Sequence, residues 1–127
     1  MTIPVAIADL VAKTEEYGWA YLLTVRDDQR PHIVAVSPVW DGEILTMDVG
    51  RRTAENASDR TSISLCYPPV EVGAYSLIVD GQARVVDDHE LHFMPTEAVL
   101  HRPAPAGFEG SSTGCGSDCA PVSPVDS

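Results

Sequence analysis

Hydrophobic and polar residues alternate in short runs along most of the chain, a pattern typical of β-strands. Six β-rich runs, separated by turn residues, lie at 19–26, 32–40, 43–49, 61–67, 75–86 and 91–101. In the fourth run, Ile63, Leu65 and Tyr67 share one face. The Asp41-Gly42 dipeptide between the second and third runs is a strong hairpin signature. The pattern therefore predicts a mainly antiparallel β protein.

Two segments favour helices instead. Apolar residues including Ile7 and Leu10 fall near helical spacing, which predicts a helix over about 5–17. Residues 51–59 fit a second short helix. Proline lacks a ladder donor, so Pro38 and Pro95 are expected at strand ends, edges or bulges, and Gly81 marks a bulge or bend in a long strand. Six strands and two short helices favour a small barrel or sandwich.

Composition changes sharply after Arg102. Residues 103–127 are rich in Pro, Gly and Ser and contain no Lys or Arg. Such a segment buries too little apolar area to offset its ordering entropy. We therefore expect one domain at 1–102, followed by a tail at 103–127 that is flexible or lies over the surface. A domain this small makes a ligand site shared between two subunits plausible on size grounds.

The net negative charge of the chain disfavours two classes of binding partner. The 127 residues carry a net charge of −11, which disfavours binding to nucleic-acid phosphates and to anionic membranes. No apolar run is long enough to span a bilayer, and the first ten residues lack the basic residues of a signal peptide. Three cysteines are too few for a disulfide scaffold, so a cytoplasmic location is expected.

Against this acidic background, two of the eight basic residues are adjacent, at Arg51 and Arg52. They follow a strand and Gly50, and they precede the helix predicted at 51–59. Free backbone N–H groups and the positive end of a helix attract a phosphate, and arginine adds charge-assisted hydrogen bonds. The sequence therefore indicates a phosphate site. The alternative is that both arginines pair with nearby acids on a solvated surface.

These segments resemble the flavin-binding split-barrel superfamily, often called pyridoxamine 5'-phosphate oxidase-like. The resemblance covers roughly residues 5–102 and rests on three places. They are the strand before Asp41-Gly42, the turn and helix that begin Gly50-Arg51-Arg52-Thr53, and the Val79-Asp80-Gly81 centre of the fifth run. It implies a six-stranded antiparallel Greek-key split barrel with short flanking helices. It also implies a homodimer that holds flavin mononucleotide (FMN), or a deazaflavin, in a groove between its subunits.

The resemblance also implies a set of cofactor-binding residues. The segment that holds the phosphate would contribute Arg51, Arg52 and Thr53. The strand along the ring and ribityl chain would contribute His32, Val34, Val36 and Ser37. The neighbouring strand would contribute Met47, Asp48 and Val49. The Arg-x-His substrate signature of the authentic oxidases is missing, so a role in vitamin B6 synthesis is not implied. Deazaflavin-using relatives need more basic residues than this chain supplies, which favours FMN.

The expected function is thus an FMN-binding, or deazaflavin-binding, oxidoreductase that acts on a small organic substrate at the dimer groove. The alternative is a non-catalytic flavin- or haem-binding or sensing module on the same barrel. The flavin carries the chemistry, so no catalytic side chain is assigned. No metal site is assigned either, because Cys115 and Cys119 form a single pair, which is compatible with a disulfide, a redox pair, half a metal site or free thiols. Trp40 and Tyr67 would either stack on the flavin or close the barrel mouth.

Overall fold

The computed structural model describes residues 1–104. Most of the expected tail, including Cys115 and Cys119, lies outside the described residues. The elements in chain order are β1 (Thr2–Val5), the 3-10 turn η1 (Ile7–Asp9), α1 (Leu10–Thr14), β2 (Ala20–Val25), β3 (Pro31–Val36), β4 (Val39–Asp41), β5 (Ile44–Asp48), α2 (Arg51–Asp59), β6 (Ser62–Tyr67), β7 (Ser76–Asp87) and β8 (Glu90–His101). Across residues 1–104, no helix is long and apolar enough to cross a membrane.

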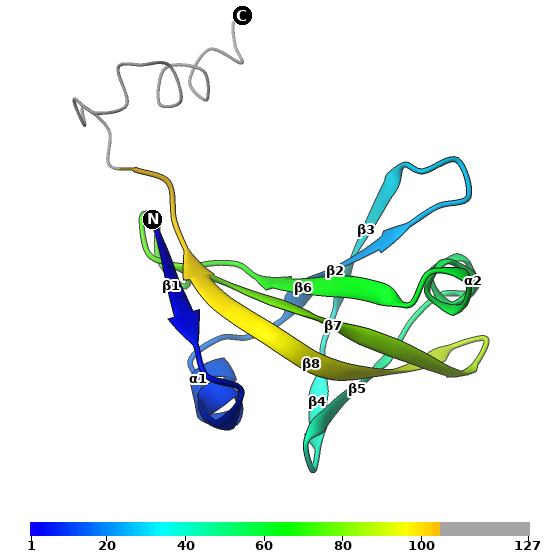
Figure 1. Ribbon diagram of the computed structural model, residues 1–127, viewed down its shortest axis with the longest axis horizontal. Helices are drawn as coiled ribbons and strands as arrows, with labels where there is room; N and C mark the ends of the chain where they lie inside the picture. Colours follow the sequence, from blue (N-terminus) through cyan, green and yellow to red (C-terminus); the bar gives the residue numbers. More distant parts are fainter. Residues whose placement is uncertain (105–127) are drawn as a thin grey trace, which may run out of the picture.

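The eight strands form one strongly curved antiparallel sheet (Figure 1). The strand order is β3-β2-β6-β7-β8-β5-β4, and β1 pairs with β8 outside this path. The end strands β3 and β4 do not pair with each other within residues 1–104, so the sheet curls without closing. The predicted mainly β, antiparallel architecture is confirmed. The strand count rises from six to eight because the run at 32–40 divides in two and β1 is added.

Strand β8 organises the molecule because it pairs along both of its edges. One edge runs against β7 over almost its whole length. The other edge pairs with β5 through Glu90–Phe93 and with β1 through Ala98–His101. The stretch between these two partners, 94–97, therefore has no strand on that side among the described residues.

The predicted bend at Gly81 is confirmed. The β7–β8 register shifts between Asp80 and Gly81, which places Gly81 opposite Pro95. A Cβ atom at Gly81 would press on the carbonyl oxygen of Met94 and approach Cζ of Phe93 at 2.7 Å. Only glycine permits this approach of the two strands. Pro95 sits at the same irregularity, as expected for a residue without a ladder donor.

The N-terminal segment differs from the helix predicted over 5–17. Residues Thr2–Val5 form β1, and α1 occupies only Leu10–Thr14 after the η1 turn. The apolar residues Ile3 and Ile7 are exposed, whereas Leu10 is fully buried. Pairing with the free end of β8 supplies backbone hydrogen bonds that a helix would otherwise provide, and this long-range partner is invisible to local periodicity.

The run predicted as one strand over 32–40 is interrupted at Ser37-Pro38. Strand β3 ends at Val36 and β4 begins at Val39, and the two belong to opposite ends of the sheet. Proline lacks the N–H that a continuous ladder requires, so the chain changes direction there. The predicted hairpin is confirmed, with Gly42 and Glu43 as its turn between β4 and β5.

The core lies inside the curved sheet. Its fully buried large side chains include Leu10, Leu22, Leu45, Leu65, Leu77, Leu91 and Phe93. Helix α2, predicted at 51–59, covers β2 and β7 with its buried residues Ala54, Asn56 and Ala57. The Asn56 amide donates to the hydroxyl of Thr24 at 3.2 Å, which satisfies both buried polar groups and fixes the helix on the sheet.

Candidate functional site

A cleft of about 520 Å³ opens between β3, the end of β5 and the start of α2, and we call it the β3–α2 cleft. It brings together residues from two separate stretches of the chain. Its lining consists of His32, Val34, Ala35, Val36, Asp48, Val49, Gly50, Arg51, Arg52 and Thr53. Eight of the ten residues proposed from the sequence are among them. Its size is within the range of small-molecule and cofactor sites.

Helix α2 points its N-terminus at this cleft. Gly50 is the N-cap residue in an extended conformation, and no side chain caps the helix. The first backbone bond within the helix runs from the Ala54 N–H to the Gly50 carbonyl at 3.0 Å. The first turn contains no acidic residue. The N–H groups of the first turn and the positive helix end are therefore available to an anion.

The two arginines differ in their surroundings. Arg51 lies 3.9 Å from Asp88, and both side chains are well exposed, so this pair holds Arg51 only weakly. Arg52 makes no ion pair within residues 1–104 and also borders a neighbouring polar hollow that includes Arg26 and Glu55. Arg51 therefore has one weak ion-pair partner, whereas Arg52 has none among these residues, although Asp28 and Glu55 line the same hollow. Thr53, which follows them, is buried.

Strand β3 forms the opposite wall. His32, Val34 and Val36 alternate along the strand and share its face toward the cleft. The imidazole of His32 is half-buried and makes no hydrogen bond among the described residues. Ser37, proposed with these residues, follows the end of β3, is exposed and does not line the cleft.

Strand β5 supplies the third wall. Asp48 and Val49 line the cleft, whereas Met47 is buried in the core at 4% exposure. Successive side chains of a strand point to opposite faces, so the side chain of Met47 points into the core and that of Asp48 points outward. Ala35 and Gly50 also line the cleft, although the sequence reasoning did not single them out as site residues.

The β7–β8 turn lies beside the cleft. The backbone N–H of Val49 donates to the carbonyl of His89 at 2.8 Å, which ties this turn to the cleft wall. The His89 ring lies 3.2 Å from a carboxylate oxygen of Asp88 and 3.0 Å from one of Asp87. The hydrogen bond to Asp88, followed by the charge of Asp87, raises the pKa of His89. Asp88 is thus shared between His89 and Arg51.

The other aromatic and thiol candidates lie away from the cleft. Tyr67 is buried in the core, edge-on to Tyr17 at 5.9 Å, and burial raises its pKa to about 12. Trp40 lines a different cleft, beside α1. Cys66 is half-buried on β6, and burial raises the pKa of its thiol, so it favours the unreactive protonated form.

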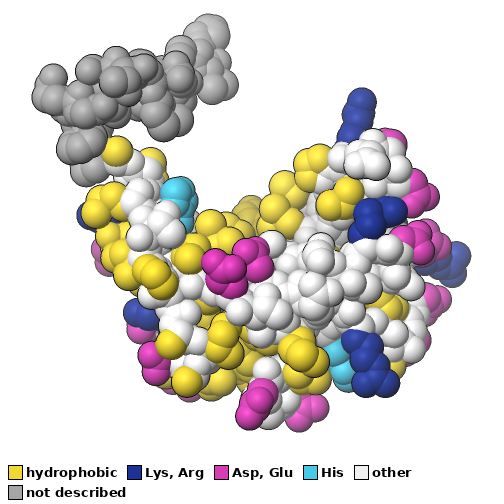
Figure 2. Space-filling view, viewed as in Figure 1, with side chains coloured by type: hydrophobic (Ala, Val, Ile, Leu, Met, Phe, Trp, Pro, Cys, Tyr) yellow, Lys and Arg dark blue, Asp and Glu magenta, His cyan; other side chains and the backbone are white. Residues whose placement is uncertain are grey.

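Figure 2 shows how charge is distributed over one face of the molecule. Most of the Lys and Arg side chains visible there lie toward α2, on the right. Hydrophobic side chains form a broad group on the opposite side, over β1 and the N-terminal segment. The basic residues of an acidic chain are thus concentrated near the helix that starts at Arg51.

No family model matches the chain. It is 37% identical over 126 residues to the uncharacterised protein Mb0449c of Mycobacterium bovis, covering 87% of this chain and 89% of the relative, and equally to MT0457 of Mycobacterium tuberculosis. These values establish common descent with both proteins.

Three solved structures share the fold. An FAD-binding protein from Mycobacterium smegmatis matches 80% of this chain and 99% of its own, with a TM-score of 0.59 and 17% identity. A Clostridium acetobutylicum protein of the pyridoxinephosphate oxidase family matches 77% and 91%, with a TM-score of 0.57 and 14% identity. The haem storage protein HutZ of Vibrio cholerae matches 72% and 91%, with a TM-score of 0.57 and 15% identity. The chain belongs to the family of the two mycobacterial proteins, and its fold is that of the pyridoxamine 5'-phosphate oxidase-like split barrels.

Proposed function

We propose that the β3–α2 cleft binds a flavin-type cofactor, with FMN favoured, and that the protein is a flavin-dependent oxidoreductase acting on a small organic substrate. One observation carries the proposal: an uncapped helix N-terminus and two adjacent arginines stand at one end of a cleft whose other wall is largely apolar. A phosphorylated ligand with a flat apolar ring would place its phosphate at the arginines and its ring against the apolar wall. Similar folds include a protein described as FAD-binding and one described as an F420 reductase.

Different residues of the cleft would contact the phosphate and the ring of the ligand. Arg51 and Arg52 would neutralise the phosphate, and the first N–H groups of α2 would hydrogen-bond its oxygens. Val34 and Val36 would pack on the ring and exclude water from it. The flavin, when bound, supplies the hydride or electron transfer, so the protein needs only to bind and orient. No side chain is assigned a proton-transfer role.

We also propose a homodimer, with the cleft completed by the second subunit. The cleft is open, and large apolar side chains remain exposed outside its lining, with Ile33 on the opposite face of β3 at 55% and Val39 on β4 at 62%. Exposed apolar groups of this size are typical of association surfaces. Sedimentation of the protein at several concentrations, with and without FMN, measures this directly. A monomer under all these conditions would contradict the dimer.

The decisive experiment is a titration with FMN followed by flavin fluorescence and visible absorbance. Arg51→Ala with Arg52→Ala removes two charge-assisted contacts worth about 1.5–3 kcal/mol each, so the affinity should fall about 100-fold or more. Arg30→Ala with Arg84→Ala is the matched control, because it removes the same charge from exposed residues outside the cleft. If both double variants bind FMN like the parent, the phosphate assignment is wrong.

His32 favours a second candidate, a haem-binding module. Its half-buried imidazole lines the cleft without a hydrogen-bond partner among the described residues, and imidazole is a common haem ligand. HutZ, which has a similar fold, is described as a haem storage protein. Addition of haem separates the two functions: a Soret band that His32→Ala abolishes would support this module. Oxidation of a reduced nicotinamide by the FMN-loaded protein would support the enzyme.

A further inference from the structure

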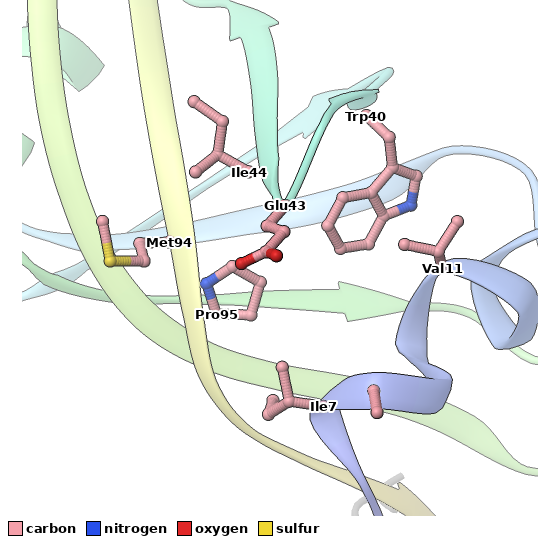
Figure 3. A pocket seen from close by; sticks show the side chains of 8 residues that line it. Ile7, Val11, Trp40, Glu43, Ile44, Met94 and Pro95 are labelled. Atoms are coloured by element: carbon pink, nitrogen blue, oxygen red, sulfur yellow. The ribbon is translucent and has the colours of Figure 1, made fainter.

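A second cleft, of about 610 Å³, lies where β8 has no strand partner on one edge, and we call it the β8-edge cleft. Met94 and Pro95 come from this unpaired stretch of β8. The β4–β5 hairpin and the segment of η1 and α1 form the other two sides (Figure 3). The two clefts share no lining residue, so this inference does not depend on the proposed flavin site.

Almost every residue lining the β8-edge cleft is apolar. Ile7, Val11, Ile44 and Met94 supply aliphatic and thioether surface, and Trp40 supplies an aromatic one. Glu43 is the one charged residue in the lining, and no Lys or Arg contributes to it. The cleft therefore presents one negative group on an apolar surface.

Glu43 is the second residue of the turn between β4 and β5 and is exposed to solvent. Gly42 has a φ of 66° and Glu43 has an ordinary negative φ, as in a type II′ hairpin turn. In Figure 3 the Glu43 side chain extends from the tip of the hairpin, and in this view its carboxylate lies between Trp40 and Pro95. Within residues 1–104 this carboxylate has no hydrogen bond and no ion pair. A charge without a partner beside apolar surface is available to a ligand cation.

Trp40 is held in place for contact with such a ligand. Its indole N–H donates to the Thr14 hydroxyl at 2.8 Å, and that hydroxyl donates to the carbonyl of Val11 at 2.9 Å. The relay fixes the indole plane against α1 and leaves its ring on the cleft side (Figure 3). An aromatic face beside a carboxylate attracts organic cations through its quadrupole as well as through apolar contact.

We propose that the β8-edge cleft is a binding site for a small organic cation with an apolar body, such as an arylalkyl ammonium compound. The apolar part would lie against Met94, Ile44 and Ile7, and the ammonium group would lie between Glu43 and the ring of Trp40. A cleft of this volume accommodates a ligand of that size.

A second copy of the chain is the competing occupant. A symmetric partner whose two-fold axis passed close to Glu43 would place two carboxylates close together in an apolar contact. Covering an unpaired charge with apolar surface is unfavourable. Charge complementarity therefore favours the cation.

The test uses three probes of similar shape and different charge: 3-phenylpropylamine, 3-phenylpropan-1-ol and 3-phenylpropanoate. Binding is followed by the fluorescence of Trp40 in a Trp19→Phe background, since Trp19 lies outside this cleft. We expect the amine to bind about tenfold more tightly than the alcohol, and the carboxylate more weakly still. Raised salt should reduce the preference for the amine.

Two variants make the result specific. Glu43→Gln should reduce the preference for the amine to about threefold or less, because only the attraction of the indole ring remains. Asp41→Asn, on the same hairpin but outside the cleft lining, removes the same charge and should leave the preference unchanged. An unchanged preference in Glu43→Gln would overturn the proposal. The absence of binding by all three probes would also overturn the proposal. If Met94→Glu then dissociated a dimer, that result would identify the cleft as a subunit interface.

Discussion

The two clefts of this molecule lie at opposite ends of one short strand yet have opposite chemistry. Strand β5 begins with Ile44 in the β8-edge cleft and ends with Asp48 in the β3–α2 cleft. The first cleft is apolar with a single carboxylate, and the second combines two arginines with a helix N-terminus. A chain with a net charge of −11 thus contains one cleft suited to an anion and one suited to a cation. Local placement of charge, rather than net charge, sets the ligand that each cleft can bind.

The largest expected effect tests whether the two clefts are structurally independent. In Gly81→Ala, the added methyl group collides with the backbone of Met94, so β8 must shift at the β8-edge cleft. We expect a loss of about 1–3 kcal/mol in the free energy of unfolding, measured with urea, together with loss of the amine preference. FMN affinity should be nearly unchanged. Gly18→Ala is the matched control, because a Cβ there meets no atom within 4 Å. Equal damage to both clefts would show that they are not independent.

A smaller effect sharpens the role of the helix end. Gly50→Asp adds an N-cap side chain that accepts a hydrogen bond from the first turn of α2, which stabilises the fold by a few tenths of a kcal/mol. The same carboxylate occupies the N–H groups and repels phosphate, so FMN affinity should fall about tenfold. Gly50→Ala leaves these N–H groups free and should retain most of the affinity. An Asp variant that binds FMN as tightly as the parent would place the phosphate elsewhere.

The smallest effect concerns the carboxylate shared by Arg51 and His89. Asp88→Asn removes the ion pair at 3.9 Å and frees Arg51, so FMN affinity should rise about two- to fivefold. The same change removes the main cause of the raised pKa of His89 and should lower that pKa, as followed by NMR. In the parent, the stabilisation from this histidine is fully present below its unfolded pKa of about 6.5 and is lost as the pH rises through its higher folded pKa. An unchanged His89 titration in the variant would contradict this assignment.

Local patterns predicted the elements whose residues decide their own structure. Alternation located β6, the hairpin dipeptide located the β4–β5 turn, and α2 begins at Arg51 as expected. The bend at Gly81 could also be predicted, because a glycine inside a long strand commonly marks a bulge or a close approach of two backbones. By contrast, β1 depends on pairing with residues about a hundred positions away, and no local pattern carries that information.

The sequence predicted the location of the β3–α2 cleft better than it predicted which single residues line it. Adjacent arginines before a helix are a local feature, so a phosphate-binding end could be proposed directly from the sequence. The family resemblance assigned Met47 to the groove together with Asp48 and Val49, although strand alternation turns the side chain of Met47 into the core. The β8-edge cleft could not be predicted, because it exists only where two different strands leave part of β8 unpaired. A lone Glu43 in a turn gives no indication of its apolar surroundings.

The bond from Trp40 to Thr14 joins two segments that are 26 residues apart in the chain. It ties the indole of the β4–β5 hairpin to the short helix α1, whose residue Val11 is exposed, as is Ile7 in the preceding η1 turn. Detachment of this helix from the hairpin would therefore break the indole's hydrogen bond and expose it to water. In a Trp19→Phe background, the fluorescence of Trp40 would report such opening at the amino-terminal end without any attached label.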